Sequence, residues 1–444
     1  MANKAKSGKS VNRQANSYKN VQRYLIAFPV IALLIKFIIM GNIQAGSWYG
    51  ADGENYMMGV NGLLKEGFFS KEPKLSYWPA GYPLLIWPLA KLTVTNVFYL
   101  ISFLQSVFFA FSTYFFTTQI RKTKFAYLAI VASFLISFNP TLSLSSLAVG
   151  YEAPIASCLM MAIGLVVKSQ SSQDSNFSIK SAIFAAAWFG LAIFMQPRFL
   201  LIGLLFMVLW AVKLNSKMSG ALLLIVSFGI MAITPSIMIY RNTKVINQAT
   251  ISTNLGVTMA IGAGDETQGG YQRSGPEVPC LPTPPATSTT DNEKVKCVIK
   301  WYLKNPVKTL KLSFNKSQFF WSPWSGPLVN GTMARNPWLK IAPTQQIAKN
   351  ADGNKLVYGS IGKLISYGWI IGQILFLFIG YRHLRRLGGS EKFYSDLIML
   401  PIVLSWLISL GTIGDHRFRI PTMALSLFFQ AAAFIALKNK LIKV

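Results

Sequence analysis

The feature that most constrains this chain is the recurrence of long apolar runs. Each run has roughly 17 to 23 residues, enough for a helix to cross the hydrocarbon of a bilayer. Only 13% of the 444 residues are charged, which is far below the share in ordinary soluble domains. No small-residue cleavage site follows the first run, residues 24–40, so we interpret it as a retained span. The sequence therefore predicts an all-α polytopic membrane protein with about ten spans.

The basic residues indicate how the spans are oriented. The net charge of +28 would fit nucleic-acid binding, but the lysines and arginines gather in short segments beside the spans. These segments are residues 4–23, 121–124, 213–217, 382–386 and 438–443. Such clustering is typical of cytoplasmic loops. We therefore expect no nucleic acid partner and place both termini in the cytoplasm. Because the sequence gives few cues of a eukaryotic source, we expect the membrane to be a prokaryotic cytoplasmic (inner) membrane.

Four segments follow from this pattern. Residues 1–20 are polar and basic and are predicted to be a disordered cytoplasmic tail. Residues 21–240 form a transmembrane bundle, whose first outer loop, 41–95, is expected to carry interfacial helices. Residues 241–360 are hydrophilic and predict an extracytoplasmic loop domain of mixed structure. Residues 361–444 return to apolar runs and predict the C-terminal transmembrane helices.

The cysteines give one structural prediction. Cys280 and Cys297 bracket a Pro/Thr-rich part of the outer segment. A disulfide between them would add about 3 kcal/mol of loop constraint. A bridge and two free thiols both remain open, because the redox state of the compartment decides between them.

Uncommon polar residues fall at the predicted outer ends of the spans. Asp52 and Glu54 stand two residues apart in the first outer loop. An ionised carboxylate beside lipid is costly unless it has a role or a partner. The same end collects a third acid and five cationic or potentially cationic residues: Glu152, Arg198, Arg241, His416, Arg417 and Arg419. Because arginine binds phosphate through paired hydrogen bonds, the cationic group predicts an anion clamp, with headgroup contact as the alternative.

A carboxylate beside a phosphate clamp suits group transfer from a lipid phosphate. Asp52 would take a proton from an acceptor hydroxyl. The arginines would stabilise the charge that grows on the departing phosphate, and the bilayer would orient the lipid tail. Asp52, Glu54 and Glu152 would also suit a divalent cation, although the sequence shows no His/Cys cluster.

Six short motifs occur along the chain in a recognisable order. They are Asp52-Gly53-Glu54-Asn55-Tyr56, Tyr77-Trp78-Pro79-Ala80-Gly81-Tyr82-Pro83, Tyr151-Glu152, Gln196-Pro197-Arg198, Asn254-Leu255-Gly256 with Ala260-Ile261-Gly262, and Arg417-Phe418-Arg419-Ile420-Pro421. In this order they resemble membrane glycosyltransferases of the GT-C fold, of the protein O-mannosyltransferase and lipid A aminoarabinose transferase kind.

The resemblance implies a polyprenyl-phosphate-linked sugar donor, inversion at the anomeric carbon and Asp52 as general base. Tyr56, Tyr82 and Glu152 lie within the motifs and are assigned to substrate binding. Glu54 departs from the adjacent acidic pair of the protein mannosyltransferases, which leaves its catalytic role open. The resemblance does not identify the acceptor as a glycan, a lipid or a protein, because these families differ most in the acceptor they use.

Two alternatives remain. One is a transporter or flippase of lipid-linked sugars, and the other is a glycan polymerase or ligase that uses a pyrophosphate-linked donor. Transporters place ionisable groups near the bilayer midplane, whereas these spans are nearly free of charge. Lys36, near the outer end of the first span, is expected to snorkel to the interface, with a site role as the alternative.

Overall fold

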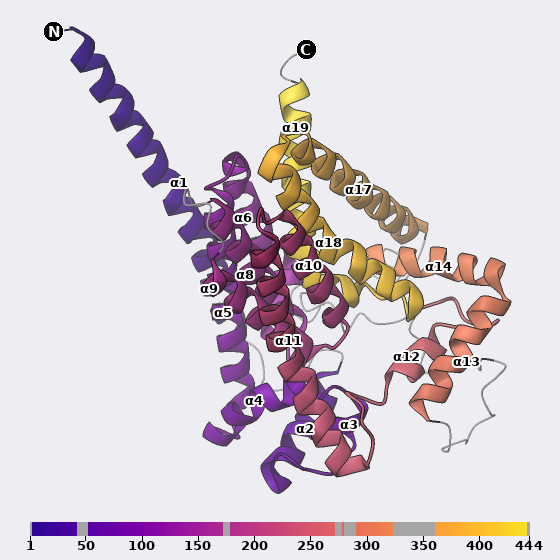
Figure 1. The fold of residues 1–444 in the computed structure, drawn as a ribbon. Helices are drawn as coiled ribbons and strands as arrows, with labels where there is room; N and C mark the ends of the chain where they lie inside the picture. The colour runs from indigo at the N-terminus through magenta and orange to yellow at the C-terminus, as the bar shows by residue number, and fades with distance from the viewer. Residues whose placement is uncertain are drawn as a thin grey trace.

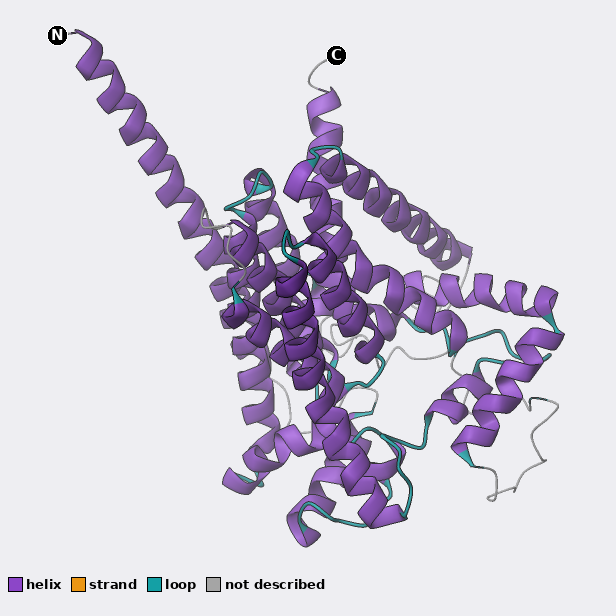
Figure 2. Ribbon diagram, viewed as in Figure 1, coloured by secondary structure: helices purple, strands orange, loops and turns teal. Residues whose placement is uncertain are grey.

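The computed structural model describes residues 2–41, 52–171, 178–270, 278, 290–322 and 360–441. This part of the chain is built from helices and contains no β-strand (Figures 1 and 2). An isolated bridge pairs Gly270 with Gly414. The chain is an all-α polytopic membrane protein, as the apolar runs predict.

Seven of the described helices are long and apolar enough to cross a membrane. They are α1 (Ala2–Gly41), α5 (Val97–Ile120), α8 (Glu152–Ser171), α11 (Lys217–Ile246), α17 (Ser360–Arg385), α18 (Gly389–Gly411) and α19 (Ile420–Leu441). An eighth span is formed if the bent pair Ala126–Phe138 and Pro140–Leu147 is counted as one. That pair comprises η1 (Ala126–Leu128), α6 (Ala129–Phe138), α7 (Pro140–Leu144) and η2 (Ser145–Leu147).

Two shorter apolar helices complete the expected set. They are α9 (Ile179–Met195) and α10 (Phe199–Lys213), and they meet at Gln196-Pro197-Arg198. The sequence predicts a break there because proline cannot continue the hydrogen-bond ladder and arginine avoids the bilayer centre. Where the sequence predicts about ten spans, the described residues thus hold seven or eight helices long enough to cross a membrane, and α9 and α10 fall short of that length.

Two expectations about α1 need correction. The helix begins at Ala2, so it includes residues 2–20 of the segment that was expected to be disordered. Lysine, glutamine and alanine are good helix formers, and a span that is already helical removes the nucleation cost. Lys36 does not snorkel: it is buried, and its Nζ donates to Ser146 Oγ at 3.1 Å and lies 4.6 Å from the Phe109 ring centroid. The serine and the ring lie within reach of the side chain, so the ammonium turns into the bundle.

Helix α8 lies at the centre of the bundle. It packs against α5, α9 and α19, and 83% of its apolar window is buried. A helix that is apolar on all sides is expected to be enclosed by others. Gly164 allows a close approach, because an added Cβ would lie 2.7 Å from the Phe115 ring. The first residue of this central helix, Glu152, is thereby fixed in the middle of one end of the bundle.

The first outer loop folds into three helices at that end. They are α2 (Gly53–Glu66), α3 (Lys74–Tyr77) and α4 (Gly81–Leu92). Helix α4 meets the end of α9 so closely that a Cβ on Gly81 would lie 1.7 Å from the Phe194 carbonyl oxygen. These helices hold the N-terminal part of the chain against the bundle.

The described part of the hydrophilic segment 241–360 consists of helices joined by loops. Its helices α12 (Leu255–Ile261), α13 (Asp291–Lys304) and α14 (Pro306–Trp321) lie to one side of the bundle (Figure 1). Helix α14 packs against α18 and against η5 (His416–Arg419). Cys297 is disulfide-bonded and Cys158 is free and buried; the predicted partner Cys280 lies outside the described residues.

The predicted inner loops meet one another at the opposite end. Lys124 lies 3.8 Å from Glu391, and the Tyr127 hydroxyl lies 3.2 Å from His383 Nε2. The same end of the molecule carries both termini in Figure 1. The loops that the sequence assigns to one side of the membrane are thus neighbours in the structure.

Candidate active site

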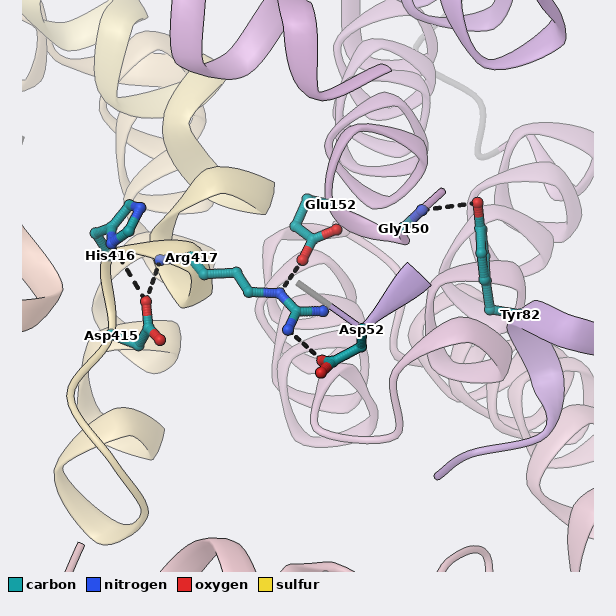
Figure 3. A network of polar contacts seen from close by, with 7 residues as sticks. All are labelled: Asp52, Tyr82, Gly150, Glu152, Asp415, His416 and Arg417. Carbon is teal, nitrogen blue, oxygen red and sulfur yellow. Dashed lines mark hydrogen bonds and ion pairs between the residues drawn. The ribbon is translucent and has the colours of Figure 1, made fainter. Parts of the chain in front are cut away.

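The guanidinium of Arg417 joins two acids that are far apart in the sequence (Figure 3). Its Nη1 donates to Asp52 Oδ2, and its Nε donates to Glu152 Oε1. Asp52 precedes α2, Glu152 opens α8 and Arg417 lies in η5 before α19. The three side chains are between 6% and 14% exposed. The structure therefore brings acids from the first outer loop and the central helix to a cation from the end of the chain.

The turn that carries Arg417 is fixed by its own neighbour. Asp415 Oδ1 accepts a hydrogen bond from the Arg417 backbone N–H at 3.0 Å and so caps the 3₁₀ turn η5. The same oxygen lies 3.3 Å from Nδ1 of His416, which is fully buried. In Figure 3 the His416 ring lies on the far side of the turn from Asp52 and Glu152. His416 therefore borders the turn and does not face the two acids.

Glu152 is positioned by a short segment that is not α-helical. Tyr82 accepts a hydrogen bond from the Gly150 backbone N–H at 2.9 Å, and Gln105 Nε2 donates to the same hydroxyl at 3.0 Å. Ser102 donates to the Leu147 carbonyl at 2.7 Å. Non-helical backbone inside a membrane bundle requires such partners, because no lipid can supply them. Tyr82, predicted to bind substrate, thus also fixes the backbone that presents Glu152.

Three buried phenol rings surround the ion pair. Tyr56 contacts Tyr82 edge to face at a centroid distance of 5.1 Å, and it contacts Tyr151 at 6.3 Å. The Arg417 guanidinium lies 4.9 Å from the Tyr151 centroid, a favourable cation–π distance. Burial raises the pKa of Tyr56 and of Tyr151 above the ordinary value. The rings therefore stay neutral and enclose the charged groups in an apolar wall.

Arg198 is a predicted cation whose guanidinium packs on aromatic rings. Its guanidinium lies 4.2 Å from the Phe418 centroid and 5.9 Å from that of Tyr151. Its Nε and Nη2 are buried, and neither donates a hydrogen bond to a described residue. Burial is also the main reason why the pKa of Arg198 is lowered. Because buried charged donors are costly without an acceptor, this guanidinium is the group most suited to hold an anion.

Arg241, predicted to bind the donor phosphate, donates its hydrogen bonds to neighbouring protein groups. It is fully buried, and its donors reach the carbonyl oxygens of Phe68, Ser70 and Leu75 and the side chain of Asn242. These contacts join the first outer loop to α11. A guanidinium has five N–H donors, and here they serve loop carbonyls, so we leave Arg241 out of the candidate anion site.

Arg419 is also occupied by the fold. Its Nη1 donates to the Trp321 carbonyl at 2.9 Å and to Gln373 Oε1 at 2.5 Å, and its Nη2 donates to the Ser322 carbonyl at 3.1 Å. It is 1% exposed. The two arginines of the Arg417-Phe418-Arg419 motif thus have different partners. Arg417 binds the two acids, and Arg419 anchors the end of α14.

Glu54 lies apart from the charged group. It is exposed in the first turn of α2 and forms no ion pair with a described residue. An acid in the first turn is favoured by the helix dipole, which accounts for its position without chemistry. Its catalytic role stays a prediction.

The two buried acids do not form a metal site as they stand. Where a divalent cation would sit between Asp52 and Glu152, both carboxylates bind the Arg417 guanidinium. No group of three His, Cys, Asp or Glu side chains suited to a metal occurs among the described residues. Since a cation would compete with the guanidinium for the same oxygens, we derive no step through a metal.

The sequence analysis did not single out several residues that build this site. Gly150 leaves room for Glu152, because an added Cβ would lie 2.5 Å from its Oε2. Asp415 and Gln105 act through hydrogen bonds to the turn and to Tyr82. Adjacency to a motif was the available signal for Gly150 and Asp415, whereas nothing in the apolar run around Gln105 marks it.

Comparisons with known proteins give a likeness of fold. No family model and no curated protein sequence matches the chain. Among solved structures, the archaeal oligosaccharyltransferase AglB from Archaeoglobus fulgidus, in complex with an inhibitory peptide and a dolichol-phosphate, is similar over 94% of this chain and 51% of its own, with a TM-score of 0.49 and 13% identity. A second structure of the Archaeoglobus fulgidus oligosaccharyltransferase, tethered to an acceptor peptide, gives the same identity and TM-score, and one with Zn and sulfate gives 14% identity.

The chain spans about half the length of this oligosaccharyltransferase. An oligosaccharyltransferase is a glycosyltransferase, the class that the sequence motifs resemble. At this identity and TM-score we base no argument on the likeness, and the activity is inferred from the residues of the site.

Proposed function

We propose that this chain is a membrane glycosyltransferase that moves a sugar from a polyprenyl phosphate to an acceptor hydroxyl. The observation that carries the proposal is the pairing of Asp52 and Glu152 through Arg417, near an Arg198 whose Nε and Nη2 have no acceptor among the described residues. A carboxylate that can act as a base, Asp52, and a guanidinium that can bind an anion, Arg198, lie at one end of a bundle of membrane-spanning helices. Lipid-linked phosphate donors are the substrates for which such a site is suited.

Asp52 is the proposed general base. Its Oδ2 is held by Arg417, while no hydrogen bond from a described residue occupies its Oδ1. One oxygen is therefore fixed, and the other is available to an acceptor hydroxyl within hydrogen-bond reach. Glu152 shares the guanidinium and orients it, so its proposed role is to position Arg417 and the substrate.

Arg198 is the proposed phosphate ligand. Arg417 is already neutralised by two carboxylates, so a phosphate would bind there only against their repulsion. Arg198 has buried N–H donors to offer, and its stacking on Phe418 fixes the plane of the guanidinium. The anion clamp expected from five cationic residues is thereby reduced to Arg198, with Arg417 close by.

The proposed reaction is a single displacement at the anomeric carbon. The acceptor oxygen attacks this carbon from the face opposite the phosphate, and a new C–O bond forms as the bond to the phosphate oxygen breaks. The polyprenyl phosphate leaves with the bonding electron pair and is stabilised by Arg198. Asp52 receives the proton of the acceptor hydroxyl, and the configuration at the anomeric carbon is inverted.

We also propose that this end of the bundle faces away from the cytoplasm. The basic loops are clustered at the opposite end, as the positive-inside rule requires for cytoplasmic loops. In this orientation residues 41–95 and 241–360 are extracytoplasmic and both termini are cytoplasmic, in the inner membrane of a prokaryote. The acceptor then approaches from the aqueous side.

The experiment separates donor binding from catalysis. We expect lipid extracts of the purified full chain, analysed by mass spectrometry, to contain a polyprenyl phosphate or its sugar-linked form. Arg198→Gln should lose most of this lipid, whereas Asp52→Asn should retain it and lose sugar transfer by about 1,000-fold or more, because a base contributes on the order of 100- to 10,000-fold. Arg382→Gln, an exposed arginine at the inner end, is the matched control and should change neither property.

Two outcomes would overturn the proposal. One is an Asp52→Asn variant that transfers sugar at the full rate. The other is co-purification of a pyrophosphate-linked lipid in place of a monophosphate, which would indicate a polymerase or ligase. Net movement of an intact lipid-linked sugar across the bilayer without turnover would instead indicate a transporter.

A further inference from the structure

Helices α13 and α14 expose an apolar surface that the proposed reaction does not use. On α14 it consists of Val307, Leu310 and Phe314, which are 81%, 73% and 66% exposed. Their spacing of three and four residues places them on one face of the helix. Leu303, near the end of α13, is 78% exposed. We call these four residues the apolar stripe.

The stripe is distinct from the face that holds α14 to the protein. The buried residues of this helix are Leu312, Lys316, Phe319, Phe320 and Trp321. At 100° per residue, the first four of these point to the side opposite Val307, Leu310 and Phe314. Helix α14 is therefore apolar on two faces, one packed against the bundle and one left open. Since α14 is not among the helices able to span the membrane, lipid contact along a span does not explain the open face.

Lysines flank the stripe. Residues 294–316 contain seven lysines and no acidic residue. Lys296, Lys300, Lys304, Lys308 and Lys311 are exposed, and within the described residues Lys308 alone of these five forms an ion pair, with Asp265 at 2.6 Å. An apolar stripe bordered by lysines is typical of a helix that lies in the plane of an anionic membrane surface.

Contacts with a span place α14 at the correct depth for this role. Trp406 Nε1 donates to Ser317 Oγ at 3.0 Å, and Lys316 Nζ donates to the Leu410 carbonyl at 2.9 Å. Trp406 and Leu410 belong to the last turns of α18, where this candidate span ends at Gly411. Figure 1 shows α14 crossing beside the ends of α17 and α18. The helix thus lies where a span leaves the bilayer, which is the headgroup zone.

We propose that the apolar stripe of α13 and α14 docks onto the anionic surface of the membrane in which the protein is embedded. The stripe enters the boundary between headgroups and acyl chains, and Lys300, Lys304 and Lys311 contact lipid phosphates. Such docking fixes the extracytoplasmic helices relative to the bilayer and to the turn that carries Arg417. The inference does not depend on the proposed reaction.

The test measures the surroundings of a probe on the stripe. Leu310→Cys is labelled with a bimane fluorophore in the full chain and reconstituted into phosphatidylcholine nanodiscs with and without phosphatidylglycerol. Lipids brominated on the upper acyl chain should quench this probe about threefold more than a probe at Asn292→Cys, an exposed position at the start of α13, because only the former enters the interface. Adding phosphatidylglycerol should increase the quenching at position 310.

A matched pair of triple variants tests the lysines. Changing Lys300, Lys304 and Lys311 to Gln should remove the increase caused by phosphatidylglycerol. Changing Lys122, Lys213 and Lys217 to Gln, which are exposed lysines of the inner loops, should leave it unchanged. Quenching of the Leu310 probe by aqueous iodide and not by brominated lipid would overturn the proposal. So would a probe shielded from both quenchers in a protein that cross-links to a second copy through position 310.

Discussion

Glu152 depends on a neighbouring residue that has no side chain. An added Cβ on Gly150 would lie 2.5 Å from Glu152 Oε2, closer than real contacts allow. Gly150→Ala should therefore displace the carboxylate from Arg417 and reduce sugar transfer by about 100-fold, the effect expected when a site is misplaced by about 1 Å. The rate of transfer at saturating donor is the measurement.

The control for this substitution is Gly229→Ala in α11. An added Cβ at Gly229 meets nothing within 4 Å, so this variant should keep the full rate and the same expression. A Gly150→Ala enzyme as active as the Gly229→Ala enzyme would show that the position of Glu152 does not matter for transfer.

Lys316 links stability to pH. Burial lowers its pKa to about 7, although Tyr302 and the Leu410 carbonyl accept its hydrogen bonds. The unfolded chain keeps this lysine protonated up to about pH 10, so between pH 7 and 10 the unfolded state binds the extra proton. Stability should therefore rise with pH in this window, by up to about 2 kcal/mol between pH 7 and 9. Thermal unfolding of the full chain in detergent is the measurement.

Lys316→Met should remove most of this rise. The methionine keeps the apolar stem but has no titratable group, so its unfolding temperature should change little between pH 7 and 9. An unchanged slope in the variant would mean that another group causes the pH dependence.

At the scale of elements, close helix contacts decide how the bundle packs. Helices α17 and α19 approach at Gly380, where an added Cβ would lie 1.9 Å from the Phe429 carbonyl oxygen. Small residues permit such contacts inside membranes. Gly380→Ala should force the helices apart and destabilise the protein by about 1–3 kcal/mol. Gly372→Ala, two turns earlier in α17, meets nothing within 4 Å and should be neutral or slightly stabilising.

The measurement for both variants is the temperature at which half of the purified protein leaves the monodisperse peak in size-exclusion chromatography. We expect a lower value for Gly380→Ala and an unchanged value for Gly372→Ala. Equal values for the two variants would show that α17 and α19 can separate without loss.

The helices could be predicted from the sequence better than the contacts between side chains. Hydropathy locates spans because a bilayer admits helices whose backbone groups are satisfied internally, and Gln196-Pro197-Arg198 breaks a run for a local chemical reason. The partners of each arginine have no such local signature. Arg241 and Arg198 look alike in the sequence at the outer ends of spans. Arg241 donates to carbonyls of the first outer loop, whereas Nε and Nη2 of Arg198 donate to none in the described part of the chain. Which arginine remains available is decided by tertiary packing.

At the scale of the whole molecule, the orientation in the bilayer can be tested independently of the chemistry. The full chain has three cysteines; Cys158 is buried and free, and Cys297 is disulfide-bonded. Single substitutions Glu266→Cys, in the loop after α12, and Lys122→Cys, in the loop between α5 and η1, introduce exposed thiols at the two ends. Because the basic loops are predicted to be cytoplasmic, a membrane-impermeant maleimide should label Glu266→Cys in intact cells and Lys122→Cys only after permeabilisation. The parent chain, treated in the same way, gives the background labelling. The reverse pattern would place Asp52, Glu152 and Arg417 on the cytoplasmic side, and it would require a donor presented from the cytoplasm.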